Sequence, residues 1–382
     1  GVTLGSTDRG AFKAVAAYNS VSKSSLAVLY VSDLATKAVT DITADKTTGV
    51  NAGKDVITLK ATVKDESDNP VSNAEVYWGS DNDSGTFAPD DTSVTNALGV
   101  AEITYSATSA VPTVIGAGVS SEYKTLSVDF TGDASTSLIA AVQADKTKAV
   151  ADNAEQVTWH AVAKDANGNA LPGVTVNWSS DNADLKLSGV SSVTDATGTA
   201  SISGYTAKAG DFLVTATIVA TGKSLTAAKV SFVGDVKTAG VSALISDKKT
   251  VAANNSDSAK YSVTVKDVNG NLVPDAKVVW TTSMNTLSVS SSQTDANGSA
   301  LVNLTGATIG QVTVTATIGS STRKVDDVVF VNNLEDLWVV NSANSEYDSP
   351  EIKGFRSLGF VTDLPTTGPT TLDWQTNGYS DV

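Results

Sequence analysis

A block of about fifteen residues that occurs three times constrains the fold of this chain more than any other sequence feature. It reads VKDESDNPVSNAEVYW at 63–78, AKDANGNALPGVTVNW at 163–178 and VKDVNGNLVPDAKVVW at 265–280. The three terminal tryptophans are 100 and 102 residues apart, at Trp78, Trp178 and Trp280. So long a period predicts one whole domain for each repeat, because solenoid repeats are only about 20 to 50 residues long.

Each copy has the sequence pattern of short β-strands. In the first copy, Ile57, Leu59 and Ala61 alternate with polar residues, and this period of two is the signature of a strand with one buried face. Roughly seven such runs separated by turn signals indicate an immunoglobulin-like sandwich. We predict an all-β fold of tandem immunoglobulin-like β-sandwiches in an elongated rod, with a small C-terminal module.

Aromatic and glycine positions recur at matching offsets in the copies. We expect Trp78 to be buried and to meet Phe130, in the last strand of its copy, across the sandwich core. The equivalent pairs are Trp178 with Phe232 and Trp280 with Phe330. A turn glycine of each copy is expected to have positive φ, namely Gly99, Gly198 and Gly298.

The first 33 residues resemble the end of a copy, since Val28 and Tyr30 match Val328 and Phe330. We predict that they are the last three strands of a fourth copy, with an exposed edge and a half-covered apolar face. Such a piece is expected to be poorly ordered, cleaved from its other half, or paired with another chain. The predicted divisions are a partial domain at 1–35, sandwiches at 36–133, 134–235 and 236–332, and a distinct module at 333–382.

The junctions between copies have a constant length. An Asp-Lys pair opens each copy 15 residues after the last aromatic residue of the preceding one, at Asp45-Lys46, Asp145-Lys146 and Asp247-Lys248. A flexible linker tolerates changes in length, so a constant junction predicts a fixed contact between domains. At about 3.3 Å per strand residue, three domains end to end would reach about 110–130 Å.

Residues 333–382 do not follow the repeat and are predicted to form a separate module, too short for a large core. Their aromatic residues are candidates for receptor contact, because large aromatic side chains often dominate binding surfaces. The alternative is that they form the core of the module itself. The candidates are Trp338, Tyr347, Phe355, Phe360 and Trp374.

Charge and residue usage exclude several function classes. The net charge of −15 and the isoelectric point of about 4.4 argue against nucleic-acid binding, which needs clustered Lys and Arg. The chain has no cysteine, so thiolate nucleophiles and Cys-containing metal sites are excluded. Its single histidine, His160, falls on the outward side of an alternating strand, so a Ser-His-Asp triad is not expected. We predict that the chain is not an enzyme.

The turns Asp165–Asn169 and Asp267–Asn271 have two possible interpretations. Their Asp-x-Asn-Gly-Asn sequence resembles half of a calcium loop, but the glutamate at position 12 is missing. Asn-Gly between two alternating runs is a strong hairpin signal, which we favour. Structural calcium there, or at Asp133 and Asp235, stays an open alternative. The Lys beside each junction Asp favours ion pairing, so no cofactor is expected.

The repeat VTVKDVNGNLVPDAKVVW, followed by TDANGSALVNLT and VTVTATI, resembles the group-1 bacterial immunoglobulin-like domain of intimin and invasin adhesins. The resemblance covers about residues 1–331. It implies the surface-exposed extracellular region of a cell outer membrane protein, held by an N-terminal barrel that lies outside this sequence. It further implies attachment to a receptor, protein or glycan, on host cells or other bacteria. No receptor-binding residue transfers, because 333–382 lack the cysteines and length of the family's lectin-like domain.

The leading hypothesis is therefore an adhesin stalk and tip that mediates attachment. An alternative is a structural or decoration protein of a phage virion, which can also carry tandem immunoglobulin-like domains. A third is an accessory module for carbohydrate processing. That hypothesis requires outward-facing aromatics, whereas the aromatics of the repeat are predicted to face inward.

Overall fold

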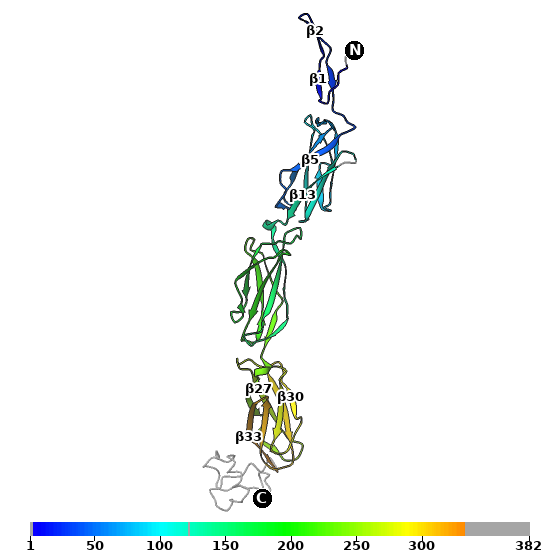
Figure 1. Cartoon of the computed structure of the whole chain (residues 1–382). Coiled ribbons are helices and arrows are strands. Elements are labelled where there is room, and N and C mark those ends of the chain that lie inside the picture. The colour runs from blue at the N-terminus through cyan, green and yellow to red at the C-terminus, as the bar shows by residue number, and fades with distance from the viewer. Residues whose placement is uncertain (1–2, 121–122, 333–382) are drawn as a thin grey trace, which may run out of the picture. The chain divides into compact units, whose positions relative to one another are not determined.

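The computed structural model describes residues 3–120 and 123–332, which fold almost entirely as β-structure (Figure 1). The predictions for 333–382, including the five aromatic candidates, concern residues outside the described ones. No helix in the described part of the chain is long and apolar enough to cross a membrane.

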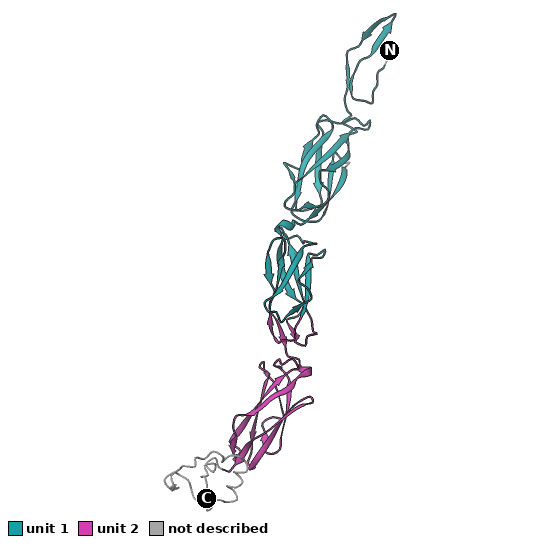
Figure 2. Ribbon diagram, turned by 90° about the vertical axis from the view of Figure 1, so that its left-hand side faces the viewer, with its two compact units in different colours: residues 1–146, 157–204, 213–229 teal, residues 147–156, 205–212, 230–382 magenta. Residues whose placement is uncertain are grey.

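The chain divides into two compact units (Figure 2). Unit 1 holds residues 1–146, 157–204 and 213–229, and unit 2 holds 147–156, 205–212 and 230–382. The division falls inside the second copy of the repeat, so the first and third copies are the two that each lie within one unit.

The first copy, in unit 1, is a sandwich of two sheets. The spatial order of the first sheet is β5 (Ala38–Ala44), β7 (Ile57–Lys64), β11 (Val100–Ala107) and β9 (Gly85–Ala88). The order of the second is β10 (Thr92–Val94), β8 (Glu75–Ser80), β12 (Pro112–Gly118), β13 (Tyr123–Thr131) and β6 (Val50–Asn51). Only β6 with β13 is parallel; the other pairs are antiparallel.

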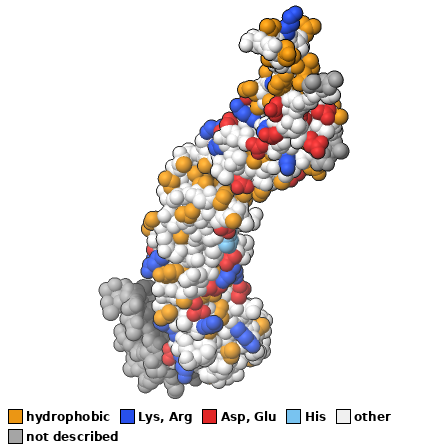
Figure 3. Space-filling model, turned by 45° about the horizontal axis from the view of Figure 1, so that its top comes forward, with side chains coloured by type: hydrophobic (Ala, Val, Ile, Leu, Met, Phe, Trp, Pro, Cys, Tyr) orange, Lys and Arg blue, Asp and Glu red, His pale blue; other side chains and the backbone are white. Residues whose placement is uncertain are grey.

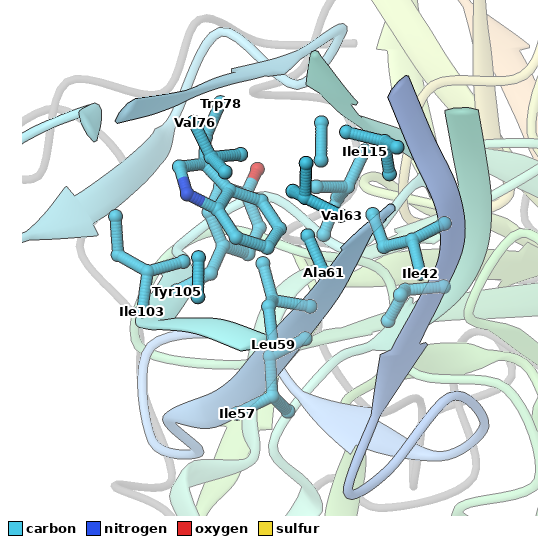
Figure 4. Close-up of a cluster of buried hydrophobic side chains, with 14 of the residues drawn as sticks. Ile42, Ile57, Leu59, Ala61, Val63, Val76, Trp78, Ile103, Tyr105 and Ile115 are labelled. Atoms are coloured by element: carbon cyan, nitrogen blue, oxygen red, sulfur yellow. The ribbon is translucent and has the colours of Figure 1, made fainter. Parts of the chain in front are cut away.

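The core of this sandwich lies between the inward faces of both sheets (Figure 4). Along β7, the inward residues Ile57, Leu59, Ala61 and Val63 are all buried, as the alternation predicts. Trp78 is only 5% exposed, and its indole Nε1 donates to Ser93 Oγ at 2.9 Å. The predicted burial of the tryptophan is therefore confirmed, and its polar atom is satisfied.

The predicted meeting of Trp78 and Phe130 across the core is wrong. Both residues lie in the same sheet, on β8 and β13, with β12 between them. Their rings are instead linked through the opposite sheet, since Phe87 lies 6.5 Å from Trp78 and Tyr105 lies 5.9 Å from Phe130. Sequence alternation assigns the buried side of each strand but not the sheet to which the strand belongs.

Unit 1 also contains the N-terminal strands. β1 (Gly10–Phe12) pairs with β4 (Val28–Tyr30), and β2 (Val15–Tyr18) pairs with β3 (Val21–Ser24). The register Gly10↔Tyr30 matches Gly310↔Phe330 of the third copy. The described residues before β5 form these two strand pairs and no closed sandwich, and Tyr18 is 80% exposed. That they are the end of a fourth copy stays a prediction.

Two further sheets of unit 1 come from the second copy. One has the order β14 (Leu138–Ala144), β16 (Val157–Lys164), β20 (Thr199–Tyr205) and β18 (Lys186–Leu187). The other has the order β19 (Ser191–Val193), β17 (Thr175–Ser180), β22 (Val214–Ile218) and β23 (Ser224–Thr226). A short 3-10 helix, η1 (Ala134–Thr136), precedes β14.

Unit 2 contains the third copy, whose two sheets repeat the strand orders of the first. The first sheet is β25 (Gly240–Ser246), β27 (Ser258–Lys266), β31 (Ser299–Thr305) and β29 (Thr286–Leu287). The second is β26 (Thr250–Ala252), β33 (Ser321–Val331), β32 (Gly310–Ile318), β28 (Lys277–Thr282) and β30 (Ser291–Gln293). Trp280 is 2% exposed within its core.

The remaining elements of unit 2 belong to the second copy and to its exit. They are a sheet of β15 (Lys148–Val150), β24 (Val230–Val233) and β21 (Gly210–Phe212), and the 3-10 helix η2 (Val236–Thr238). Phe212 and Phe232 pack edge to face at 5.6 Å.

The turn glycines have the predicted conformation. Gly99, Gly198 and Gly298 have φ of +75°, +77° and +64°. A Cβ at Gly99 would also lie 2.6 Å from the Val63 carbonyl oxygen, so both the dihedral angle and the close approach require glycine.

Candidate functional site: the repeated junction

The most regular polar structure in the described residues is the five-residue turn that follows the third strand of each copy. Its members are Asp65–Asn69, Asp165–Asn169 and Asp267–Asn271. In each turn the backbone N–H of the Asp donates to the carbonyl of the Asn, at 2.9, 3.0 and 2.9 Å. One oxygen of the Asp side chain accepts the N–H groups two and four residues later. Aspartate forms such local turns readily, because its short side chain reaches the nearby backbone.

The hairpin interpretation of these turns needs correction. A single bridge closes each turn, as between Lys164 and Ala170. The strands on either side do not pair, however, because β7 and β8 lie in different sheets, and so do β16 and β17 and β27 and β28. The turn therefore carries the chain from one layer to the other, and its side chains point out of the end of the copy.

The last Asn of each turn contacts the backbone of the preceding copy. Asn169 Oδ1 accepts the N–H of Ala110 at 2.9 Å, and Asn169 Nδ2 donates to the carbonyl of Thr108 at 2.9 Å. A primary amide offers one acceptor and a donor side by side, so it pairs with a peptide as a neighbouring strand would.

The same two hydrogen bonds recur at the other two junctions. In unit 2, Asn271 accepts from Ala209 N–H at 2.8 Å and donates to Ala207 O at 2.9 Å. In unit 1, Asn69 accepts from Arg9 N–H at 3.0 Å and donates to the carbonyl of Thr7. The fixed contact that the constant junction length predicts is therefore present at every junction among the described residues.

The Asp of each turn makes a second contact across the junction. Its other oxygen accepts a backbone N–H from the connecting segment, as from Asp133 to Asp165 at 3.1 Å and from Asp235 to Asp267 at 3.0 Å. Asp65 accepts from Asp33 N–H at 3.0 Å. Burial alone would raise the pKa of the Asp65 carboxyl, but hydrogen bonds from Asp33, Asn69 and Ser67 lower it below its ordinary value of 3.8.

The first junction differs from the other two in its central residues. Asn269 Nδ2 donates to Ala151 O at 3.1 Å, whereas the first turn has Ser67 at that position. A Cβ at Gly132 would lie 2.6 Å from Leu171 Cδ2, which shows how closely the connecting segment meets the turn. The equivalent Ser32 instead donates its hydroxyl to Pro70 O at 2.7 Å.

The predicted ion pairing of the Lys beside the junction Asp is present at Lys46 and Lys248, but each pairs with an Asp other than its sequence neighbour. Asp45 accepts the N–H of Thr58 at 2.9 Å, while Lys46 pairs at 2.6 Å with Asp55, nine residues after it. Lys248 likewise pairs with Asp257 at 2.5 Å. These pairs lie within a copy, so they fix its first loop rather than the junction.

The other candidate residues take part in local structure within the chain. Asp133 and Asp235 cap the 3-10 helices η1 and η2. No group of three His, Asp or Glu in the part of the chain described could hold a metal ion. His160 is exposed, as predicted, and its Nδ1 lies 2.8 Å from Ser201 Oγ. Figure 3 shows acidic and basic side chains mixed on the face that it presents.

We call the two hydrogen bonds between the last Asn of each turn and the preceding copy the junction clamp. Sequence reasoning missed this clamp, although its signal was visible. All three copies place Asn four residues after the turn Asp, whereas the residues between them vary. A turn alone requires the Asp, but a recurring Asn at that spacing indicates a second task. That task is to bind the peptide group of the neighbouring copy.

Comparison with known proteins finds one family in three successive segments of the chain. Residues 39–131, 139–233 and 241–331 each match the family described as bacterial Ig-like domain (group 1). The inverse autotransporter adhesin YeeJ of Escherichia coli K12 is 28% identical over 272 residues, covering 69% of this chain and 11% of YeeJ. Intimin of Escherichia coli O127:H6 is 33% identical over 214 residues, covering 55% of this chain and 22% of intimin.

Among solved structures, the Escherichia coli adhesin FdeC matches 79% of this chain and 99% of its own, with a TM-score of 0.51 and 20% identity. That likeness supports the fold alone. The chain spans less than a quarter of the curated relatives that it matches here. Because the family matches cover most of its length, the chain belongs to the group-1 bacterial Ig-like domain family and is a homologue of intimin and YeeJ.

Proposed function

We propose that this chain is the surface-exposed part of a bacterial adhesin that attaches to host cells or to other bacteria. Homology to intimin and YeeJ supports an adhesin-like role, and the family is one of non-enzymatic repeats. The observation that carries the mechanical part of the proposal is the junction clamp, which recurs with the same hydrogen bonds three times.

The clamp provides a physical basis for a stalk. At each junction the Asn accepts one hydrogen bond and donates another, and the Asp accepts a third. These bonds restrict rotation between successive copies, whereas an unclamped linker would let the copies reorient freely. Each hydrogen bond contributes about 0.5–1.5 kcal/mol, so three together hold a junction closed most of the time. Copies held in this way would carry the C-terminal residues away from the cell.

We place the receptor contact in residues 333–382 and the cell anchor, at the outer membrane, before Gly1. The partner class is a surface receptor, protein or glycan. Aromatic residues of the C-terminal segment are the proposed anchors, because buried aromatic side chains usually dominate binding energy. They are Trp338, Tyr347, Phe355, Phe360 and Trp374.

The test compares attachment of the whole chain with that of a chain ending after Val331. Fluorescently labelled protein is added to cultured epithelial cells and to bacteria, and bound protein is measured by flow cytometry. We expect the shortened chain to lose most of the binding, and Trp338→Ala with Trp374→Ala to lose it in part. Equal binding by both chains would move the activity into the Ig-like domains, and binding by neither would reduce the chain to a spacer.

A further inference from the structure

The first copy has a hollow on the outward side of its second sheet. It lies over β8, β12 and β13 and has a volume of about 650 Å³. Its floor consists of Gly79, Gly116 and Gly118, and Gly116 lies directly opposite Gly79 across the two strands. Because Trp78 points into the core, the alternation directs its neighbours Tyr77 and Gly79 outward.

Two tyrosines border the glycine floor. Tyr77 and Tyr123 both lie opposite Gly118, one on each flanking strand, so their backbones are about 10 Å apart at two strand spacings. Tyr77 is 55% exposed and Tyr123 is 70% exposed. The Tyr77 hydroxyl donates to Glu75 Oε2 at 2.8 Å, which turns its ring away from Gly79. Tyr123 Cδ2 lies 3.9 Å from the position of a Cβ on Gly116, so its ring covers that part of the floor.

The fold does not require glycine at position 79 or at position 116. None of the three floor glycines has positive φ. A Cβ on Gly79 would meet no atom within 4 Å, and one on Gly116 would make only ordinary contacts. The register places threonine at the equivalent positions of the third copy, namely Thr281, Thr315 and Thr317. Glycine inside a strand weakens the sheet and often marks a place where a ligand approaches closely.

The lining selects the chemistry of the ligand. Asp81 is the only charged residue of the hollow, and its Oδ1 accepts the N–H of Val114 at 2.7 Å. The other carboxylate oxygen is an acceptor for a ligand hydroxyl, and the negative charge disfavours anionic ligands. Because β12 pairs with both β8 and β13, the floor cannot accept an additional peptide strand.

We propose that this hollow binds a neutral glycan, with the apolar face of one pyranose ring against Tyr123 and a sugar hydroxyl on Asp81. Tyrosine suits such contact, since it offers a large rigid surface at low entropic cost. The polarised C–H groups of a sugar are also attracted to the negative face of an aromatic ring. This site is separate from the C-terminal receptor contact, and neither proposal depends on the other.

The test uses the full chain and a panel of immobilised neutral oligosaccharides built from glucose and galactose, with a matched panel that ends in sialic acid. We expect binding to neutral members of the panel and weaker binding to their sialylated forms. The double variant Gly79→Thr, Gly116→Thr introduces the residues of the third copy. It should lose at least tenfold in affinity, as should Tyr123→Ala, while the first copy stays folded.

The matched control is the reverse change in the third copy, Thr281→Gly with Thr315→Gly, which should leave glycan binding unchanged. The proposal is overturned if the original chain binds no neutral glycan at millimolar concentration, or if the filled variant binds as well as the original. If the chain instead preferred a proline-rich peptide, and Tyr123→Ala abolished that binding, the glycan proposal would be overturned and the hollow assigned to peptide recognition. Cell attachment through residues 333–382 can survive all of these outcomes.

Discussion

Two parts of the first copy, only a few residues apart in sequence, compare very differently with the other copies. The turn at Asp65–Asn69 keeps its Asp and its Asn in all three copies, and each pair makes the same contacts. The outward positions of the next strand, Tyr77 and Gly79, become Asn and Ser in the second copy and Val and Thr in the third. The turn touches the backbone of a neighbour, whereas the strand surface touches solvent.

The comparison separates two kinds of constraint within one chain. A side chain that binds a peptide group must keep its shape, because losing such a hydrogen bond costs about 0.5–1.5 kcal/mol. A solvent-facing strand position is free to vary, and neither space nor backbone conformation requires glycine at 79 or 116. The predictions below test whether tolerance to substitution follows this division.

The largest expected effect comes from adjacent residues on β8 that point to opposite sides. Trp78→Ala should lower the free energy of unfolding of the first copy by about 3–5 kcal/mol, because it empties a buried site. Tyr77→Ala should change it by less than about 0.5 kcal/mol. Hydrogen exchange of amides in β7 and β11 measures both. A large effect of Tyr77→Ala would show that the outward face is part of the core structure.

Substitution of the turn glycine Gly99 should also destabilise the first copy more than substitution of the surface glycine Gly79. Gly99→Ala is expected to cost about 1–3 kcal/mol, because φ is +75° and the new Cβ would meet the Val63 carbonyl at 2.6 Å. Gly79→Ala should cost nothing or stabilise slightly, since nothing lies within 4 Å of its Cβ position. Amide exchange in residues 39–131 of the full chain measures the stability of the first copy in both variants. Equal costs would mean that the turn glycine and the surface glycine are under the same constraint.

The junction clamp predicts a smaller, local effect. Asn169→Ala removes the acceptor for Ala110 N–H, so this amide should exchange about tenfold faster, which corresponds to the loss of about 1.4 kcal/mol of protection. Asn271→Ala should do the same to Ala209 N–H and leave Ala110 unchanged. The two variants are controls for each other. Unchanged exchange at both amides would mean that the connecting segments alone hold the junctions.

The sequence predicted the fold well because the relevant forces are local. Alternation identified the buried residues of β7, and the 100-residue period identified the repeat. It did not predict that Trp78 and Phe130 share a sheet, because pairing between strands depends on contacts distant in sequence. The hollow beside Tyr123 was missed for the same reason: its glycines come from two strands, and only the register Gly79↔Gly116 brings them together.

The junction was predicted in part. Constant spacing indicated a fixed contact, but the Asp-Lys pair drew attention to the wrong residues. Charge complementarity between sequence neighbours is a weak guide, because it ignores the groups that the fold brings close. Asp45 accepts the N–H of Thr58, and Lys46 pairs with Asp55. The contacts common to all three junctions are made by uncharged amide groups and by one carboxylate that accepts backbone N–H groups.

The smallest expected effect is the response of the first junction to acid through the carboxyl group of Asp65. Hydrogen bonds that favour the ionised carboxylate lower the folded pKa of Asp65, so its contribution to stability is fully present above the unfolded value of about 3.9. That contribution is lost as the pH falls through the lowered pKa, when protonation weakens the acceptor of Asp33 N–H. The chemical shift of the Asp33 amide should therefore titrate with a midpoint below 3.8. Asp65→Asn keeps the size of the side chain and removes its charge, so the titration should disappear. A midpoint at or above 3.8 would mean that burial outweighs the hydrogen bonds at this junction, and that Asp65 does not favour the closed junction through its charge.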